Sequence, residues 1–385
     1  MKKRIIILSP RFPFPAHKGD QLVVFNCIKY LSQRYEIDLL SFHNEEVEGY
    51  YYNSIKRYCT EIVLVRQNRI NIFYQMFKSL FSDKPLQAAY FYSNSFQSEL
   101  SQLLKKNKYD LVFPFTLRMS EYAQNIKINK YIHLIDSMYL NMKRRANNEV
   151  GIKKLIFNYE SKKVRLYERK LIHKYDKSFL VSQIDKEVID KQDSSIIVFP
   201  NGTEVHDCKK DLSGERLNIV FTGNMGYFPN QDAVVWFVKN CWNSILCNFS
   251  NANFKIIGKS PSKKIKDFQC SYKNIEVLGF VDSISSELCK ADIAISPMQS
   301  GSGMQNKILE AFAVKTPVVT TTLGLGDIKA KKEKDILVAD TAADFIKKIN
   351  YLADKEERNT IGENGFNYAL KNHSWEKIIY SRINI

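Results

Sequence analysis

Twelve short runs rich in Val, Ile and Leu alternate with longer segments of helical periodicity along this 385-residue chain, and no other feature limits its fold as strongly. The runs are continuously apolar, which is typical of parallel strands that are covered on both faces. Strands that alternate with helices predict a doubly wound α/β architecture. The runs fall at residues 4–9, 36–42, 61–66, 111–115, 130–136 and 178–182, and then at 217–223, 254–258, 275–279, 293–296, 317–321 and 335–339. Because six runs lie in each half, we expect two domains of this kind.

The two series predict two Rossmann-like domains, and the length of the chain suits two cores better than one. The join is expected near Phe199-Pro-Asn-Gly-Thr203, because Pro-Asn-Gly is typical of a turn and a charged segment without periodicity follows it. We therefore predict domains at residues 1–203 and 204–364, followed by a final helical segment at 365–385.

Composition excludes several classes of protein. A hydrophobic content of 44% excludes a disordered chain. The seven cysteines are scattered without a C-x-x-C pair, which predicts reduced thiols rather than a disulfide framework or a zinc site. No apolar run approaches the roughly 18 to 20 residues of a membrane span. The basic start and the apolar run after it imitate a signal peptide, but Pro10, Pro13 and Pro15 follow so closely that we expect a buried strand.

The net charge of +16 is concentrated in one region. Residues 138–177 contain 12 Lys/Arg and 4 Asp/Glu. This excess indicates an anionic partner, either phospholipid head groups or nucleic acid. Apolar residues recur at near-helical spacing in residues 141–177, so the segment is either a basic amphipathic helix on an anionic membrane surface or a long helix with its charges in water. No helix-turn-helix, zinc or RNP pattern accompanies the charge, and we predict no nucleic-acid partner.

A glycine loop follows the run at 293–296. Its residues Gly301, Ser302, Gly303, Met304 and Gln305 precede a helical pattern that is stopped by Pro317. Glycines let the backbone approach a ligand closely, and the free N–H groups of a helix start favour an anion such as a diphosphate.

The helix after this loop places Asn306 and Glu310 on one face. Its side chains lean toward its start, so the Glu310 carboxylate can accept hydrogen bonds from two neighbouring sugar hydroxyls. The alternative is that Glu310 only pairs with Lys307.

Polar residues also follow the first-half strands. His17, Lys18 and Gly19 precede a helical pattern that Asp20 can cap, which gives either a binding loop or a plain capped turn. Further candidates for the acceptor side of a site, with helix capping or plain exposure as the alternative, are Arg118, Asp136 and Ser137. The carboxyl edge of an open parallel sheet is where ligands bind.

The stretch from Gly301 to Thr321 resembles the sugar-nucleotide loop and helix of the family 4 glycosyltransferases, which have the GT-B fold, and Asn306-Lys-Ile-Leu-Glu-Ala-Phe-Ala313 is particularly similar. The family signature is Glu, seven residues, Glu. Glu310 matches the second glutamate, which implies contact with the nucleotide ribose, whereas Ser302 replaces the first, which binds the donor sugar in the family.

The segment from Leu217 to Asp232 resembles the opening of the family's second domain. Many members carry an arginine and a lysine here for the diphosphate, but this chain, after Gly223, has Asn224 near the position of the arginine and Pro229-Asn230 near that of the lysine. Since a buried diphosphate without a cation is costly, we expect Lys307 or Lys259 to substitute, and the alternative is that both are solvated surface lysines. The loop at Leu278-Gly-Phe-Val281 is similar to the one that meets the nucleotide base, which implies a main-chain contact from Phe280 and Val281.

The resemblance implies a retaining glycosyltransferase that moves a sugar from a nucleotide-diphosphate donor to a lipid-linked or saccharide acceptor in bacterial surface polysaccharide synthesis. Residues 1–203 would bind the acceptor, 204–364 the donor, and 365–385 would cross back to the first domain. Asp136, Gly19 and Lys307 would take part in catalysis. No D-x-D motif occurs, so no cofactor and no obligatory metal are expected. We predict a cytoplasmic protein on the inner face of the cell membrane. A sugar-nucleotide epimerase or another non-transferase enzyme on the same scaffold is the alternative.

Overall fold

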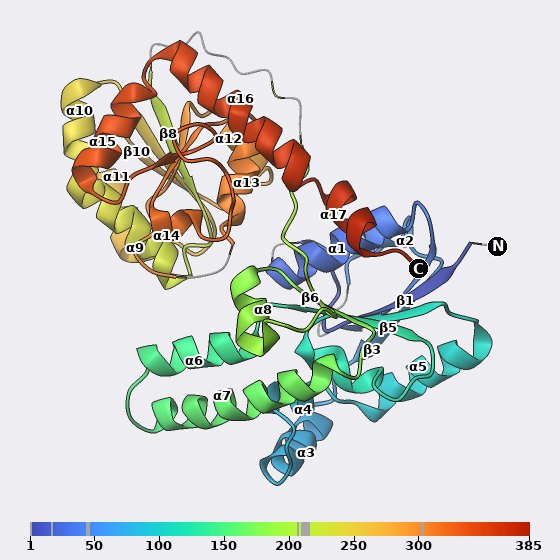
Figure 1. Cartoon of the computed structure of the whole chain (residues 1–385). Coiled ribbons are helices and arrows are strands. Elements are labelled where there is room, and N and C mark those ends of the chain that lie inside the picture. The colour runs from blue at the N-terminus through green and yellow to red at the C-terminus, as the bar shows by residue number, and fades with distance from the viewer. Residues whose placement is uncertain (1, 17, 44–46, 206–207, 209–215, 302–303) are drawn as a thin grey trace. The chain divides into compact units, whose positions relative to one another are not determined.

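A computed structural model of the chain describes residues 2–16, 18–43, 47–205, 208, 216–301 and 304–385. The chain divides into two compact units (Figure 1). The first comprises Met1–Pro200 together with Ile378–Ile385, and the second comprises Asn201–Lys377. The predicted boundary at residue 203 lies close to this division. The predicted final segment begins at residue 365, within helix α16, whereas the return to the first unit begins at Ile378.

The first unit contains a seven-stranded sheet in the order β3-β2-β1-β4-β5-β6-β7, and every pair in it is parallel. Successive residues of β1 point to opposite faces: Ile6 and Leu8 join a core with α5, α7 and α8, while Ile5 and Ile7 are buried on the other side. The strands are β1 (Arg4–Ser9), β2 (Glu36–His43), β3 (Glu61–Arg66), β4 (Leu111–Pro114), β5 (Asn129–Ile135), β6 (Lys177–Leu180) and β7 (Ile196–Val198).

Helices connect these strands, and the end of the chain packs on the same unit. The helices are α1 (Gly19–Leu31), α2 (Gly49–Lys56), α3 (Arg69–Leu80), α4 (Leu86–Tyr90), α5 (Asn94–Lys106), the 3-10 turn η1 (Leu117–Tyr122), α6 (Met138–Asn148), α7 (Gly151–Ile172) and α8 (Gln183–Asp190). The last helix is α17 (Trp375–Arg382). Its Tyr380 hydroxyl donates to the Tyr30 carbonyl at 3.0 Å, and Arg382 donates to the Val198 carbonyl at 2.7 Å. These contacts fix the chain end on the first unit.

The second unit contains a six-stranded parallel sheet in the order β10-β9-β8-β11-β12-β13. One core lies between this sheet and α9, α10, α11 and α15, and a second core lies between the opposite face and α12, α13 and α16. The strands are β8 (Asn218–Thr222), β9 (Asn253–Ile257), β10 (Ile275–Gly279), β11 (Ile293–Ser296), β12 (Val318–Thr320) and β13 (Leu337–Val338). The helices are α9 (Phe228–Phe237), the π-helical turn η2 (Val238–Trp242), α10 (Asn243–Asn248), α11 (Lys263–Ser271), α12 (Ile284–Cys289), α13 (Asn306–Phe312), α14 (Thr322–Leu325), α15 (Ala342–Tyr351) and α16 (Lys355–Asn372).

The predicted architecture of two Rossmann-like parallel sheets is confirmed. Each of the twelve predicted runs coincides with a strand to within about two residues at either end, and β7 is the additional strand. Within the described part of the chain, no helix combines the length and the apolar character needed to cross a bilayer.

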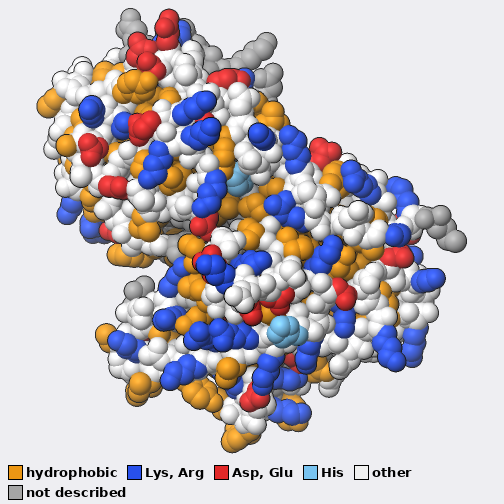
Figure 2. Space-filling view, in the orientation of Figure 1, with side chains coloured by type: hydrophobic (Ala, Val, Ile, Leu, Met, Phe, Trp, Pro, Cys, Tyr) orange, Lys and Arg blue, Asp and Glu red, His pale blue; other side chains and the backbone are white. Residues whose placement is uncertain are grey.

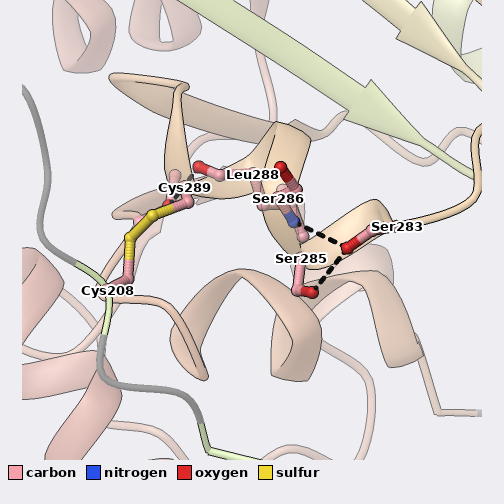
Figure 3. Close-up of a disulfide and its surroundings, with 7 residues drawn as sticks. Cys208, Ser283, Ser285, Ser286, Leu288 and Cys289 are labelled. Carbon is pink, nitrogen blue, oxygen red and sulfur yellow. Dashed lines mark hydrogen bonds between the residues drawn. A yellow bond between two sulfur atoms is a disulfide. The ribbon is translucent and has the colours of Figure 1, made fainter.

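The expectation for the cysteines is wrong for one pair. Cys208 and Cys289 form a disulfide whose Cα atoms are 6.1 Å apart, although 81 positions separate them in the sequence (Figure 3). It ties the segment after the unit boundary to the end of α12. The fold brings the two thiols together, and spacing along the chain gives no sign of this. Among the described residues, Cys27, Cys59, Cys241, Cys247 and Cys270 are free.

Candidate functional site

Both sheets have a topological switch point, where the strand order reverses. It lies between β1 and β4 in the first unit and between β8 and β11 in the second. Loops that leave neighbouring strands in opposite directions open a crevice at this point, and ligands bind there in open α/β sheets. The loops after these four strands begin at Pro10, Phe115, Gly223 and Pro297, and they carry most of the predicted site residues.

Two glycines bring the loops after β8 and β9 into close contact. A Cβ atom on Gly258 would lie 1.7 Å from the Gly223 carbonyl oxygen, and one on Gly223 would lie 2.9 Å from the Asn230 side chain. Both glycines also have positive φ angles, of 148° and 157°. The Met225 N–H donates to the Lys259 carbonyl at 3.0 Å. The backbone at this edge of the second sheet is therefore packed as closely as glycine allows.

The glycine loop after β11 lies against the start of α9. Gly301 has φ of 106°, and a Cβ atom there would be 3.1 Å from Pro229. The Ser300 hydroxyl donates to Asp232 of α9 at 3.2 Å. Ser302 and Gly303, both predicted donor-binding residues, lie outside the described residues. The loop after β11 and the helix after β8 thus meet at the switch point of the second unit.

Lys307 lies at the centre of this arrangement. Its ammonium group donates to Asn230 Oδ1 at 2.8 Å and to Gln305 Oε1 at 3.1 Å, and it lies 4.8 Å from the centre of the Phe221 ring. Burial lowers the pKa of Lys307 to about 8, and the nearby Glu310 carboxylate opposes this. The site therefore holds a cation whose described hydrogen-bond partners are neutral, which is a suitable arrangement for an incoming anion.

Glu310 is half-buried one turn further along α13. Among the described residues, its carboxylate makes no hydrogen bond and no ion pair, so the simple Lys307 pairing is not formed. Burial raises the pKa of Glu310, and the Lys307 charge lowers it. Because no described residue donates to this half-buried carboxylate, Glu310 can accept hydrogen bonds from a ligand.

Helix α13 is shorter than the pattern suggests. It spans seven residues and ends at Phe312, where continuation to Val314 is expected from the sequence. A helix of two turns contributes little N-terminal charge, so the positive charge at this site rests mainly on Lys307. Its first residue, Asn306, accepts a hydrogen bond from Asn201 at 2.9 Å.

Other predicted donor residues differ in their surroundings. Asn224 is exposed and its side chain accepts from the Gly226 N–H at 3.0 Å. Met304 and Val281 pack partly against the core beneath α13. Phe280 is an exposed aromatic residue next to Gly279. The half-buried Lys259 side chain has no hydrogen bond or ion pair with any residue the structure describes, so Lys307 is the better placed of the two candidate cations.

Three charged residues meet at the switch point of the first unit. Arg11, two residues after β1, places Nε 3.0 Å from the Asp20 carboxylate, and Arg118 in η1 places Nη1 3.8 Å from it. Burial and the Arg11 charge lower the pKa of Arg118, whereas Asp20 raises it. The expectation that Asp20 caps α1 needs correction, because Lys18 occupies the cap position and Asp20 lies in the first turn.

Asp136 follows β5 directly and is exposed to solvent at the same edge. Partial desolvation by the surrounding protein raises its pKa to about 6, with Asp185 and Asp20 adding to the effect and Arg144 opposing it. The preceding residue, Ile135, has φ of 70°, which is rare for a β-branched side chain. Backbone strain of this kind concentrates at functional positions, so it supports a role for this edge.

Ser137 has a structural role in this fold, which corrects its placement on the acceptor side. It is fully buried, its hydroxyl donates to Glu168 at 3.0 Å, and it caps α6. Glu168 also accepts from the Met138 N–H at 2.6 Å. Burial raises the pKa of Glu168 to about 8, and these hydrogen bonds lower it. Ser137 and Glu168 thus hold the start of α6 directly after Asp136.

The remaining acceptor-side residues lie at the start of α1. Gly19 is its first residue, and a Cβ atom there would meet nothing within 4 Å. No described residue fills the space next to Gly19. His17 lies outside them.

Sequence reasoning missed three contributors to these sites. Asn230 and Phe221 surround the Lys307 ammonium, and Arg11 completes the charged group around Asp20. Asn230 stands near the position where the family has its lysine, which was the one available signal. Arg11 gave none, because only the strand order shows that it lies near Arg118.

The fold is similar to that of several solved structures. The structure resembles that of the Anabaena protein HepE in complex with UDP and glucose, with a TM-score of 0.66, 12% identity and 98% of each chain covered. It also resembles the apo form of WaaB, a lipopolysaccharide outer core galactosyltransferase, with a TM-score of 0.60, 12% identity, and coverage of 99% of this chain and 100% of that one. The chain has the GT-B fold.

The match to a protein family lies in the second unit. Residues 216–355 match the family described as glycosyl transferases group 1. An uncharacterized 44.6 kDa protein in the cps region of Klebsiella pneumoniae is 24% identical over 398 residues, with 98% of each chain covered. Residues 216–355 are therefore similar to the glycosyl transferases group 1 family, in agreement with the resemblance noted in the sequence.

Proposed function

We propose that this enzyme transfers a sugar from a nucleotide-diphosphate donor to a lipid-linked or saccharide acceptor in bacterial surface polysaccharide synthesis, with retention of anomeric configuration. The donor binds to the second unit and the acceptor to the first. The observation that carries the proposal is the half-buried Lys307 ammonium, held by neutral partners at the switch point. One turn away lies the Glu310 carboxylate, to which no described residue donates a hydrogen bond.

In this proposal Lys307 neutralises the diphosphate as it leaves the sugar. Negative charge builds up on the leaving oxygen during the transfer, and a cation already held in place stabilises it without reorganisation. Asn230 and Gln305 hold the ammonium group in the free enzyme. Glu310 accepts the ribose hydroxyls. Gly223 and Gly301 allow the main chain to approach the phosphates.

The acceptor is proposed to meet the charged edge of the first unit. Arg11 and Arg118 carry two positive charges against the one carboxylate of Asp20, and Asp136 offers a second carboxylate nearby. A saccharide hydroxyl can donate to Asp136, and a phosphate on a lipid-linked acceptor can accept from the arginines. Two similar proteins support an acceptor from surface polysaccharide synthesis, because WaaB is a lipopolysaccharide galactosyltransferase and the Klebsiella relative belongs to a cps region.

A lipid-linked acceptor places the enzyme at a membrane. We propose that it is a cytoplasmic protein, peripheral on the inner face of the cell membrane, and that the basic segment containing α6 and α7 contributes to this location. Exposed basic residues near an anionic bilayer each add roughly 1 kcal/mol of binding free energy.

Calorimetry with a panel of nucleotides, nucleosides and nucleotide sugars tests the donor site. Lys307→Ala should weaken UDP or GDP binding by about ten- to hundredfold while leaving the free nucleoside almost unaffected, because a charge-assisted hydrogen bond contributes about 1.5–3 kcal/mol. Glu310→Gln should weaken the diphosphate and the nucleoside equally, by about tenfold. Lys264→Ala, an exposed lysine of α11, is the matched control and should change neither. Equal losses for nucleotide and nucleoside in Lys307→Ala would refute the phosphate role.

The epimerase alternative predicts a different product. Incubation with a nucleotide sugar alone would then yield an isomeric nucleotide sugar. The transferase proposal expects slow hydrolysis at most until an acceptor is added, and chromatography of the products separates the two.

A further inference from the structure

Helix α3 displays an apolar face to solvent. Six large apolar side chains on this helix and its C-cap are each more than half exposed: Ile70, Phe73, Tyr74, Phe77, Leu80 and Phe81. Their spacing of three and four residues puts them along one stripe of the helix. Such a stripe normally faces a core, and contiguous apolar surface of this kind indicates an interaction site.

The opposite face of α3 fixes the helix to the first unit by polar contacts. Asn71 donates to the Tyr92 carbonyl at 2.8 Å, and the Ser79 carbonyl accepts from Lys163 of α7 at 2.6 Å. Ser79 is buried, whereas the aromatic residues around it are not. The packing thus turns the polar side of α3 inward and its apolar side outward, so the exposed apolar face is a feature of the folded unit.

The neighbouring helix α7 continues the apolar surface. Its N-terminal half carries a second group of apolar side chains that are more than half exposed, namely Val150, Ile152, Leu155, Ile156 and Tyr159. Two side chains of α7 connect it to α3 and to the segment after α3. Lys163 donates to the Ser79 carbonyl near the end of α3, and Glu160 accepts from the Leu86 N–H at 2.5 Å. We call the two groups together the α3–α7 surface. In Figure 2, hydrophobic and basic side chains lie side by side in the region where Figure 1 draws α3 and α7.

The charge of the α3–α7 surface indicates which kind of partner it binds. Residues 69–81 contain Arg69 and Lys78 and no acid, and residues 150–159 contain Lys153 and Lys154 and no acid. Two copies of the surface facing each other would bring eight cations of these segments together without a counter-charge. An anionic bilayer supplies both the apolar interior and the negative head groups, and the long basic side chains can reach those head groups.

We propose that the α3–α7 surface inserts into the interfacial region of an anionic phospholipid bilayer, with α3 as the penetrating element. A helix of 12 residues is about 18 Å long, which is too short to cross a hydrocarbon core of about 30 Å, so α3 lies in the plane of the membrane. This inference rests on the proposed membrane location and adds that α3, which lies outside the basic segment, is the helix that penetrates the bilayer. Sugar transfer itself does not depend on it.

Vesicle flotation tests the proposal. The full chain should float with vesicles of equal parts phosphatidylglycerol and phosphatidylcholine, and weakly with phosphatidylcholine alone. The triple variant Phe73→Ser, Phe77→Ser, Phe81→Ser should partition into the vesicles at least about tenfold less, since it removes three aromatic side chains that the bilayer would bury. Lys153→Glu with Lys154→Glu should lose about tenfold on anionic vesicles and little on neutral ones. Leu370→Ser, an exposed apolar residue of α16, should change nothing.

A fluorescent reporter separates penetration from mere electrostatic contact. The three tryptophans of the chain lie in the second unit, at positions 236, 242 and 375. Phe73→Trp should therefore add an emission that brominated lipids quench, while Leu370→Trp should add one that they do not. An unquenched Phe73→Trp, or unchanged flotation of the triple variant, would overturn the proposal.

Two further measurements keep the outcomes distinct. A concentration-dependent dimer that the triple variant abolishes, without vesicle binding by the full chain, would assign the surface to a second copy and overturn the membrane proposal. Nucleotide binding by the triple variant should stay unchanged. If the full chain binds nucleotide but not vesicles, the membrane inference fails while the proposed reaction stands.

Discussion

The two switch points use different chemistry on the same scaffold. In the second unit, Gly223, Gly258 and Gly301 allow the backbone to come close, and one lysine supplies the charge. In the first unit, non-glycine residues with positive φ lie at the ends of two strands, Thr116 shortly after β4 and Ile135 at the end of β5, and two arginines surround the Asp20 carboxylate.

This difference indicates different ligands. A diphosphate presents the same geometry in every nucleotide sugar, so a closely packed backbone with one fixed cation suits it. The edge with Arg11, Asp20 and Arg118 carries both signs of charge, which suits a ligand with hydroxyl and phosphate groups. The variants below test this contrast, beginning with the one expected to change most.

Gly258→Ala should have the largest effect. Its Cβ atom would collide with the Gly223 carbonyl oxygen at 1.7 Å, and φ of 148° is unfavourable for alanine. The loops after β8 and β9 would have to separate, which should lower the free energy of unfolding of the second unit by about 3 kcal/mol. Urea denaturation followed by tryptophan fluorescence measures this, because the tryptophans lie in that unit. An unchanged midpoint would show that close packing at this edge is not required.

The charge on Lys307 predicts how donor binding depends on pH. The pKa of Lys307 is lowered to about 8 in the free enzyme, and a bound diphosphate would raise it. Binding then takes up a proton above about pH 8. Affinity should be constant below that pH and fall by up to about tenfold per unit above it. Calorimetry with UDP across this range measures the slope, and Lys307→Gln should remove it. A slope that persists in the variant would assign the titration to another group.

Asp136 predicts a titration at lower pH in the first unit. Its pKa is raised to about 6, and only the carboxylate can accept an acceptor hydroxyl proton. The rate of transfer should therefore fall by up to about tenfold per unit as the pH drops below about 6. Asp136→Asn should be slow and should lack this acid limb in a profile of initial rates. An intact limb in the variant would remove Asp136 from this role.

Much of this organisation could be predicted from the sequence, and the exceptions share a cause. Continuous apolar runs identify buried parallel strands, so both sheets could be predicted, while β7 has only three residues and leaves a weak pattern. Lys307 and Glu310 could be named because residues 301–321 resemble the family's loop and helix locally, and their roles stay predictions. Local patterns of this kind need no knowledge of the rest of the fold.

Features that depend on distant packing could not be predicted. The Cys208–Cys289 bridge and the approach of Arg11 to Asp20 depend on which strands are neighbours and how the loops fold back. For α3 the periodicity is clear, yet the same stripe predicts a core-facing side as readily as a free one. Only the inward contacts of Asn71 and Ser79 show which side faces out.

Gly19→Ala should have the smallest effect on the fold and is the sharpest contrast to Gly258→Ala. A Cβ atom on Gly19 meets nothing within 4 Å, and the residue begins a 13-residue helix, so alanine should leave the stability of the first unit unchanged or raise it by up to about 1 kcal/mol. If a ligand approaches the backbone there, the added methyl group should raise the KM for the acceptor severalfold while donor binding stays constant. Thermal unfolding and initial rates at varied acceptor concentration measure the two effects. An unchanged KM would mean that the open space above Gly19 is a feature of the loop alone, and that close backbone approach to the ligand is confined to the second unit.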